Sequence, residues 1–225
     1  MQVFDLPLAM QAWWPLVQKG LLISLPMAVI SFAIGLILAV FVAMMKLSRH
    51  IVPKAIGTAF VSIIRGTPLL IQLYLPFYVL PAITGVTVPP VVSAVLALSL
   101  NVAGYAGETI RGSINAVPQG QWEAARTIGL NRVQSMRRVI LPQALRISVA
   151  PLSNTFIGLV KDTSLTSIVM VTEMLREAQR IATPTYEFTT VYIVAAAIYW
   201  LICTPLSFAQ KRLEDYLDRT YATAK

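Results

Sequence analysis

The chain has 225 residues, of which 56% are hydrophobic and 12% are charged, and its mean hydropathy is +0.70. Soluble domains carry about 25% charged residues, so the composition excludes an ordinary soluble domain and indicates an integral membrane protein. The net charge of +8 falls between long apolar segments, so we assign it to membrane orientation and expect no nucleic-acid partner. The single cysteine, Cys203, excludes an internal disulfide and a multi-cysteine metal site.

The N-terminal segment from Met1 to Gln18 carries one charged residue, Asp5, and no basic residue. Cleavable signal peptides begin with basic residues ahead of an apolar core. Trp13 and Trp14 suit a membrane interface, where tryptophan is enriched. We therefore expect a short amphipathic lead-in to the first membrane span.

Five segments are long and apolar enough to cross a bilayer, which requires about 20 residues for about 30 Å of hydrocarbon. The sequence predicts an all-α fold, a polytopic helix bundle forming one transmembrane domain over residues 1–225. The predicted spans cover residues 21–45, 57–80, 88–107, 147–171 and 188–210.

The basic residues predict the orientation, because loops rich in Lys and Arg face the cytoplasm. Lys19, Arg176 and Arg180 lie in one set of connections. The opposite set and the C-terminal tail hold Lys46, Arg49, Lys54, Arg111, Arg126, Arg132, Arg137, Arg138, Arg146, Lys211, Arg212, Arg219 and Lys225. We expect the N-terminus outside and the C-terminus in the cytoplasm.

The sequence predicts that the long cytoplasmic connection forms two short helices over residues 119–142. Pro118 precedes good helix formers, and Gly129 fits the left-handed position that ends a helix. Asn131 can cap a second helix, which we expect Pro142 to end. One face of that second helix is apolar, formed by Val133, Met136 and Ile140. The pattern alone leaves open whether the segment packs on its own bundle or docks another protein.

The spacing of this segment resembles the EAA motif of ABC importer permeases. The residues that carry the resemblance are Glu123, Ala124, Ala125, Gly129, Ile140, Leu141 and Pro142. The resemblance implies a type I ABC importer permease in which these residues couple to a groove on an ATP-binding subunit.

Three further stretches resemble the polar amino acid group of these permeases, with the cystine type closest: residues 65–72, 105–112 and 161–165. The resemblance implies the transmembrane subunit of an importer for cystine, glutamine or a basic amino acid, working by alternating access in a bacterial inner membrane. It implies an ATP-binding subunit dimer that holds ATP and Mg²⁺, a second permease copy or close relative, and an external solute-binding protein. The chain itself would bind no cofactor.

Three charged residues lie within predicted spans: Arg65, Lys161 and Asp162. Such charges cost about 2.5–3.5 kcal/mol at the bilayer centre and normally face protein or water. They can brace the bundle as ion pairs, or they can shape a solute path. Pro68 disturbs the helix beside Arg65, and broken helices at membrane depth are tolerated where they line a cavity.

The backbone breaks, the hydroxyls and amides beside them and the family resemblance together predict a substrate pathway. We assign it to Thr67, Gln72, Asn101, Asp162, Thr163 and Ser164. Glu108 and Arg111 are three residues apart and fit a simple helix ion pair, or alternatively part of an inner gate.

Sequence motifs for catalysis are absent. The chain has no Gly-x-x-x-x-Gly-Lys-Ser/Thr loop, so the energy for transport must come from another chain or from an ion gradient. Its one histidine, His50, forms no metal or Ser/His/Asp constellation, so we expect no enzyme. The alternative function is an ion-gradient-driven amino acid transporter without an ATPase partner.

Overall fold

The computed structural model describes residues 4–222, with side chains described as far as residue 217, so Lys225 and the side chain of Arg219 lie outside it. All regular structure within this part of the chain is helical, which confirms the all-α prediction. Three helices are long and apolar enough to cross a membrane, and the number rises to five when each of two bent helix pairs counts as one span.

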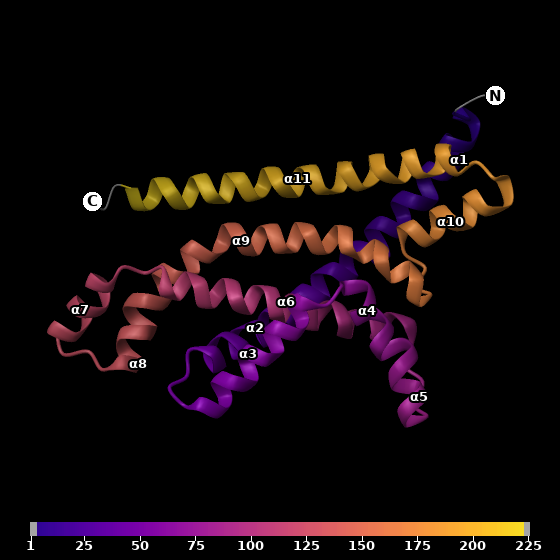
Figure 1. Ribbon diagram of the computed structural model, residues 1–225. Helices are drawn as coiled ribbons and strands as arrows, with labels where there is room; N and C mark the ends of the chain where they lie inside the picture. Colours follow the sequence, from indigo (N-terminus) through magenta and orange to yellow (C-terminus); the bar gives the residue numbers. More distant parts are fainter. Residues whose placement is uncertain (1–3, 223–225) are drawn as a thin grey trace.

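The chain traces a bundle of long helices with two short helices projecting at one end (Figure 1). In chain order the α-helices are α1 Leu6–Lys19, α2 Leu25–Lys46, α3 Ile51–Gly66, α4 Leu69–Tyr74, α5 Leu80–Thr84, α6 Pro90–Asn115, α7 Gln119–Thr127, α8 Arg132–Ser135, α9 Leu141–Asp162, α10 Met174–Thr185 and α11 Phe188–Ala222. Single π turns join α1 to α2, α4 to α5 and α8 to α9, and a 3₁₀ segment over Thr163–Val169 follows α9.

The first helix is longer than the predicted span 21–45. It runs without a break from Leu6 to Lys46, 41 residues that reach about 60 Å at 1.5 Å per residue. Asp5 caps its start, where its carboxylate accepts a hydrogen bond from the Leu8 N–H at 3.0 Å. The expected lead-in is therefore the first part of this helix, and it packs against α10 and α11.

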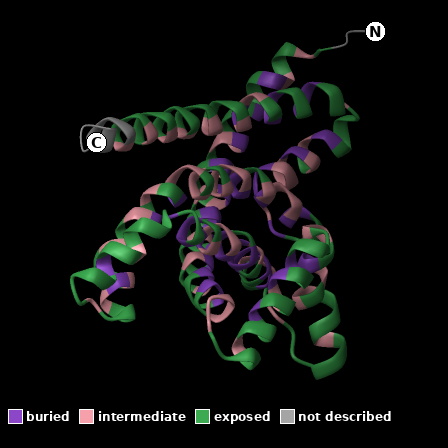
Figure 2. Ribbon diagram, turned by 60° about the vertical axis from the view of Figure 1, so that its left-hand side comes forward, coloured by how far each residue is buried: buried purple, intermediate pink, exposed green. Residues whose placement is uncertain are grey.

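The helices α2 and α6 cross at the centre of the bundle, where small residues permit a very close approach. A Cβ atom added at Gly35 would lie 2.5 Å from the Cβ of Val102 and 2.8 Å from the carbonyl oxygen of Ser99. On α6, Gly104 faces Ile64 of α3 with no room for a side chain. The buried residues gather in this central region, while the outer faces of the bundle are exposed (Figure 2). Small-residue contacts of this kind are typical of helix packing in membranes.

The predicted second span, residues 57–80, is not a single helix. Thr67 and Pro68 adopt extended backbone conformations, and the helices on either side are bent by 106°. Pro68 has no N–H to continue the helical ladder, so the predicted disturbance at this position is confirmed. The helical residues then continue to Thr84, beyond the predicted end of the span, and Gly85 ends them in a left-handed conformation.

The segment over residues 119–142 has the predicted turn and cap. Gly129 has a φ of +80°, and the Leu130 N–H donates to the Ala125 carbonyl oxygen at 3.1 Å, as in a helix-ending Schellman turn. Asn131 accepts from the Gln134 N–H at 2.9 Å and forms a complete capping box with that residue.

The prediction that Pro142 ends the second helix is wrong. The helix starting at Arg132 passes through a π turn at Met136–Ile140 and continues as α9 to Asp162. A π turn shifts the hydrogen-bond register of a helix, which accommodates the missing N–H of Pro142 at the second position of α9. The apolar face predicted for this helix is only partly buried, since Ile140 is buried but Val133 is 75% exposed.

The remaining helices also extend beyond the predicted spans. α6 continues to Asn115 and α11 to Ala222, compared with predicted ends at 107 and 210. The connection before α11 contains α10, capped by the fully buried Glu173. Its carboxylate accepts hydrogen bonds from the N–H groups of Leu175 and Arg176 and from the hydroxyls of Ser24 and Tyr199. This carboxylate ties the first helix, α10 and α11 together.

Candidate functional site: a polar cavity beside the broken helix

Gln72 stabilises the break between α3 and α4. Its side-chain amide nitrogen donates to the Ile64 carbonyl oxygen at 2.7 Å, and to the carbonyl and hydroxyl oxygens of Thr67 at 3.1 and 3.0 Å. These bonds satisfy oxygen atoms that the interrupted helix leaves without a backbone partner. The Gln72 side-chain oxygen accepts from Nδ2 of Asn101 on α6 at 2.9 Å. Gln72 is buried, and its hydrogen bond to Asn101 holds the break against α6.

A cavity of about 320 Å³ lies between the break, α6 and α9. Three of the predicted pathway residues line it: Thr67, Asn101 and Asp162. The other three do not, because Gln72 supports the wall from behind, and Thr163 and Ser164 lie in the 3₁₀ segment after α9. The other lining residues are Pro68, Leu69, Val102, Tyr105, Thr155, Gly158, Leu159 and Leu165.

Sequence reasoning found Asp162 of α9 but missed three other residues that this helix contributes to the cavity. Thr155, Gly158 and Leu159 precede Asp162 by seven, four and three residues. These spacings put all four residues on one face of a helix. Reading the helix face back from Asp162 would have found them.

The charges near the cavity are not paired with one another. Among the described residues, no ion pair joins Arg65, Lys161 and Asp162, and the Asp162 carboxylate accepts no hydrogen bond. The Arg65 guanidinium instead lies over the ring of Tyr105, 5.6 Å from its centroid. The structure therefore lacks the bracing ion pairs and leaves the carboxylate available to a cavity ligand.

The predicted coupling residues divide into exposed and buried ones. Glu123 and Ala124 are exposed on α7, whereas Ala125 and Ile140 are buried against the bundle. Leu141 is half-buried and Pro142 is exposed. Ile128 beside the Gly129 turn is 73% exposed, an unusual position for a large apolar side chain outside a span. The segment therefore packs on its own bundle through one face and leaves an apolar edge exposed.

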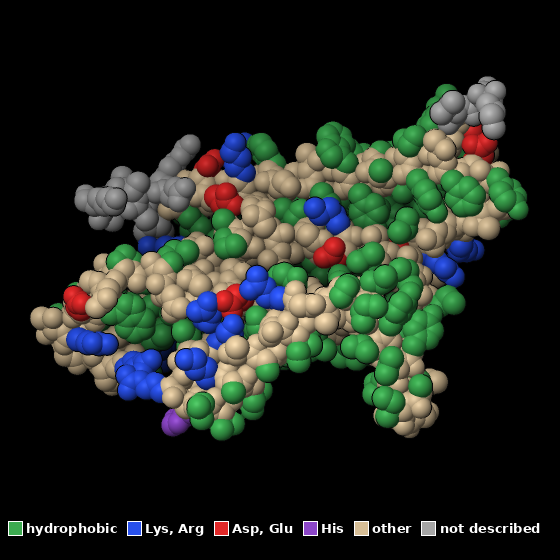
Figure 3. Space-filling view, viewed as in Figure 1, with side chains coloured by type: hydrophobic (Ala, Val, Ile, Leu, Met, Phe, Trp, Pro, Cys, Tyr) green, Lys and Arg blue, Asp and Glu red, His purple; other side chains and the backbone are tan. Residues whose placement is uncertain are grey.

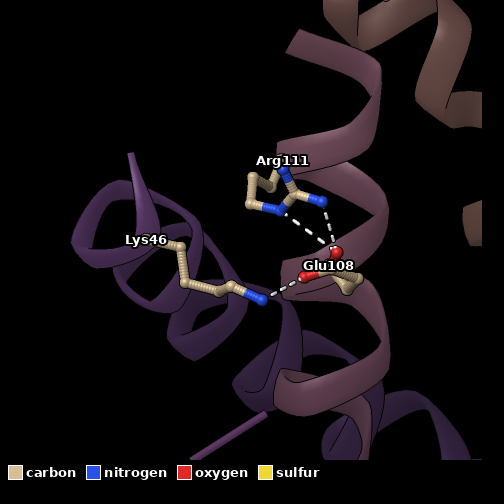
Figure 4. Close-up of polar contacts among 3 residues, drawn as sticks. All are labelled: Lys46, Glu108 and Arg111. Atoms are coloured by element: carbon tan, nitrogen blue, oxygen red, sulfur yellow. Dashed lines mark hydrogen bonds and ion pairs between the residues drawn. The ribbon is translucent and has the colours of Figure 1, made fainter. Parts of the chain in front are cut away.

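Glu108 joins two helices at the same end of the molecule. It forms the predicted pair with Arg111, at 2.5 Å, and it also pairs with Lys46 at the end of α2, at 2.5 Å (Figure 4). The second partner was not predicted, because it comes from a helix 62 residues away in the sequence. Lys and Arg side chains gather around this end, over α3, α7 and α8 (Figure 3).

Sequence comparison finds related proteins over most of the chain. Residues 31–219 match the family described as the binding-protein-dependent transport system inner membrane component. The L-cystine transport system permease protein TcyB of Bacillus subtilis (strain 168) is 48% identical over 216 residues, which cover 96% of this chain and 92% of that protein.

Solved structures with the same fold are also transporters. A crystal structure of an amino acid ABC transporter with histidines has a chain that is 34% identical, with a TM-score of 0.88 and coverage of 93% of this chain and 97% of that one. The inward-facing MetNI methionine ABC transporter is 22% identical with a TM-score of 0.73, covers 95% of this chain and 99% of its own, and shares the fold. These relatives do not support the ion-driven alternative. The chain belongs to the family of binding-protein-dependent transport system inner membrane components, the non-catalytic transmembrane permeases of ABC importers.

Proposed function

We propose that the chain forms the pathway for a polar amino acid of the cystine type in an ATP-driven importer. The observation that favours the cystine type is the 48% identity to TcyB over nearly the whole chain. Glutamine and basic amino acids are the nearest competitors, because they share the zwitterionic group that the cavity can recognise. A cavity of about 320 Å³ lies within the usual range for small-molecule sites, about 300–1,000 Å³.

The polar groups of the cavity complement an amino acid. Asn101 uses its Nδ2 to donate to Gln72, which leaves its side-chain oxygen as an acceptor. Thr155 donates its hydroxyl proton to the Pro151 carbonyl at 2.9 Å and can then only accept. Together with the Asp162 carboxylate, these acceptors favour a ligand ammonium group. Arg65, over Tyr105 at the cavity edge, supplies positive charge for a ligand carboxylate.

In this proposal the free edge of the coupling segment binds an ATP-binding subunit. Glu123 and Ala124 on α7, with Ile128 just after its end, provide an exposed surface, and the backbone at Gly129 fixes the angle of α7 to the following helix. That helix is continuous with α9, so movement of the docking surface can reach Asp162 through one rigid element. ATP and Mg²⁺ belong to the partner subunit, and alternating access follows from movement of α9 against the broken helix.

The complete transporter in this proposal contains two permease copies, or this chain with a close relative, and two ATP-binding subunits. An external solute-binding protein delivers the amino acid. The orientation places the N-terminus outside and the C-terminus in the cytoplasm of a bacterial inner membrane. The basic residues around α7 and α8, on the proposed cytoplasmic side, support this orientation.

Uptake into proteoliposomes tests the proposal. The purified complex, with its ATP-binding subunit and solute-binding protein, is expected to accumulate labelled cystine only when ATP is present, with weaker uptake of glutamine and arginine. Preference for another amino acid would contradict the substrate class. Uptake that needs an ion gradient but no ATP would contradict the ATP-driven mechanism.

A further inference from the structure

A second cavity, of about 550 Å³, opens at the end of the molecule that carries the coupling segment. The loop after α2 forms one wall, and α7, α8 and the π turn before α9 form the other. Three arginines, Arg49, Arg132 and Arg137, and His50 line it, and no Asp or Glu is among the described residues that line it. The transport cavity described above is a separate site with different lining residues.

The three arginines of this cavity have no anionic partner in the described part of the chain. The ion pairs found there join Lys46 or Arg111 to Glu108, and Arg180 to Glu177. Arg49, Arg132 and Arg137 are all exposed; Arg49 comes from the loop after α2, and the other two come from the helix that begins at Arg132. The cavity therefore gathers positive charge with no carboxylate in its lining, which favours binding of an anion.

The remaining lining is apolar and leads directly to the outer surface of the bundle. Trp122, Met136 and Leu141 line the inner wall. Met44 lines the cavity and is itself 41% exposed on α2, one turn after Phe41, which is 63% exposed. An exposed apolar strip on a spanning helix faces acyl chains, so the cavity lies where hydrocarbon gives way to headgroups.

We propose that this cavity binds an anionic phospholipid of the membrane leaflet next to the coupling segment. The arginines would hold the phosphate of the headgroup, and Met44, Met136 and Trp122 would contact the upper acyl chain. Basic pockets between transmembrane helices recognise anionic headgroups in this way. Because Trp122, Arg132 and Arg137 belong to the coupling segment, the bound lipid would brace the segment against the end of α2. The cytoplasmic placement of this leaflet rests on the proposed orientation, but binding itself does not.

Lipid retention measured by native mass spectrometry tests the site. The full chain is purified in mild detergent with equal amounts of phosphatidylglycerol and phosphatidylcholine, and bound lipids are counted for each class. We expect the wild-type chain to retain phosphatidylglycerol about tenfold over phosphatidylcholine. The triple variant R49Q/R132Q/R137Q is expected to lose this preference. Equal retention of the two lipids by the wild-type chain would overturn the proposal without any variant.

A matched variant separates the cavity from general surface charge. K54Q/K211Q/R212Q removes the same charge from exposed positions that do not line the cavity, and it should keep the preference. The charge-preserving variant R49K/R132K/R137K should also keep it and controls for folding. Loss of the preference in K54Q/K211Q/R212Q would overturn the site.

Co-purification of the ATP-binding subunit gives an independent readout. A triple glutamine variant that still prefers phosphatidylglycerol but loses this subunit would show that the arginines serve protein docking, and the lipid assignment would be wrong. A wild-type chain that binds the subunit but shows no lipid preference would contradict only the lipid site and leave the proposed function intact.

Discussion

Replacing Gly35 with valine is expected to prevent the chain from accumulating as a folded protein. The added Cβ would lie 2.5 Å from the Cβ of Val102 and 2.8 Å from the Ser99 carbonyl oxygen, so α2 and α6 must separate along their contact. Overpacking of this kind costs about 1–3 kcal/mol, and the backbone clash puts Gly35 at the upper end. Fluorescence-detected size-exclusion chromatography of a tagged chain measures the folded yield.

Gly112 provides the matched control for this substitution. It lies on the exposed face of α6, and an added Cβ there meets no atom within 4 Å. Gly112→Val should therefore keep a normal folded yield and nearly the wild-type thermal stability. If Gly35→Val were as stable as Gly112→Val, the close crossing of α2 and α6 would be wrong.

Replacing Asp162 with asparagine is expected to reduce transport about tenfold to a hundredfold while leaving assembly intact. The substitution keeps the shape of the side chain and removes the charge that faces the cavity. A charged hydrogen bond contributes about 1.5–3 kcal/mol, which corresponds to this range of apparent affinity. Because Asp162 accepts no hydrogen bond and forms no ion pair among the described residues, the fold loses little.

Lys161→Gln is the matched control, since Lys161 is exposed, adjacent to Asp162, and does not line the cavity. The measurement is the concentration dependence of amino acid uptake into proteoliposomes, with the amount of assembled complex determined in parallel. Equal uptake and equal apparent affinity in Asp162→Asn and the wild-type chain would remove Asp162 from the substrate site.

Features set by local backbone chemistry could be predicted from the sequence. The left-handed turn at Gly129, the cap at Asn131 and the break at Pro68 each depend on the dihedral preferences of one or two residues. The apolar segments indicated an all-α membrane bundle, because spanning helices require long runs without charge. The resemblance in the coupling segment then indicated the family.

Features set by packing between distant segments could not be predicted. A proline inside a helical segment normally ends the helix, but at Pro142 the helix continues because a π turn precedes it. The Lys46–Glu108 pair and the role of Gln72 as a brace behind Asn101 depend on which helices meet. The same holds for Thr163 and Ser164, which are polar and close to Asp162 in sequence but lie outside the cavity.

Co-purification of the ATP-binding subunit with the tagged full chain tests the central claim most directly. The account predicts that the wild-type chain brings this subunit with it, that Gly129→Val reduces the amount at least severalfold, and that Glu123→Ala also weakens binding. Valine is strained at a φ of +80°, so Gly129→Val would tilt α7 away from its docking angle, whereas Gly112→Val should behave as wild type. Full recovery of the subunit and full coupled ATP hydrolysis with Gly129→Val and Glu123→Ala would contradict the assignment of the coupling surface.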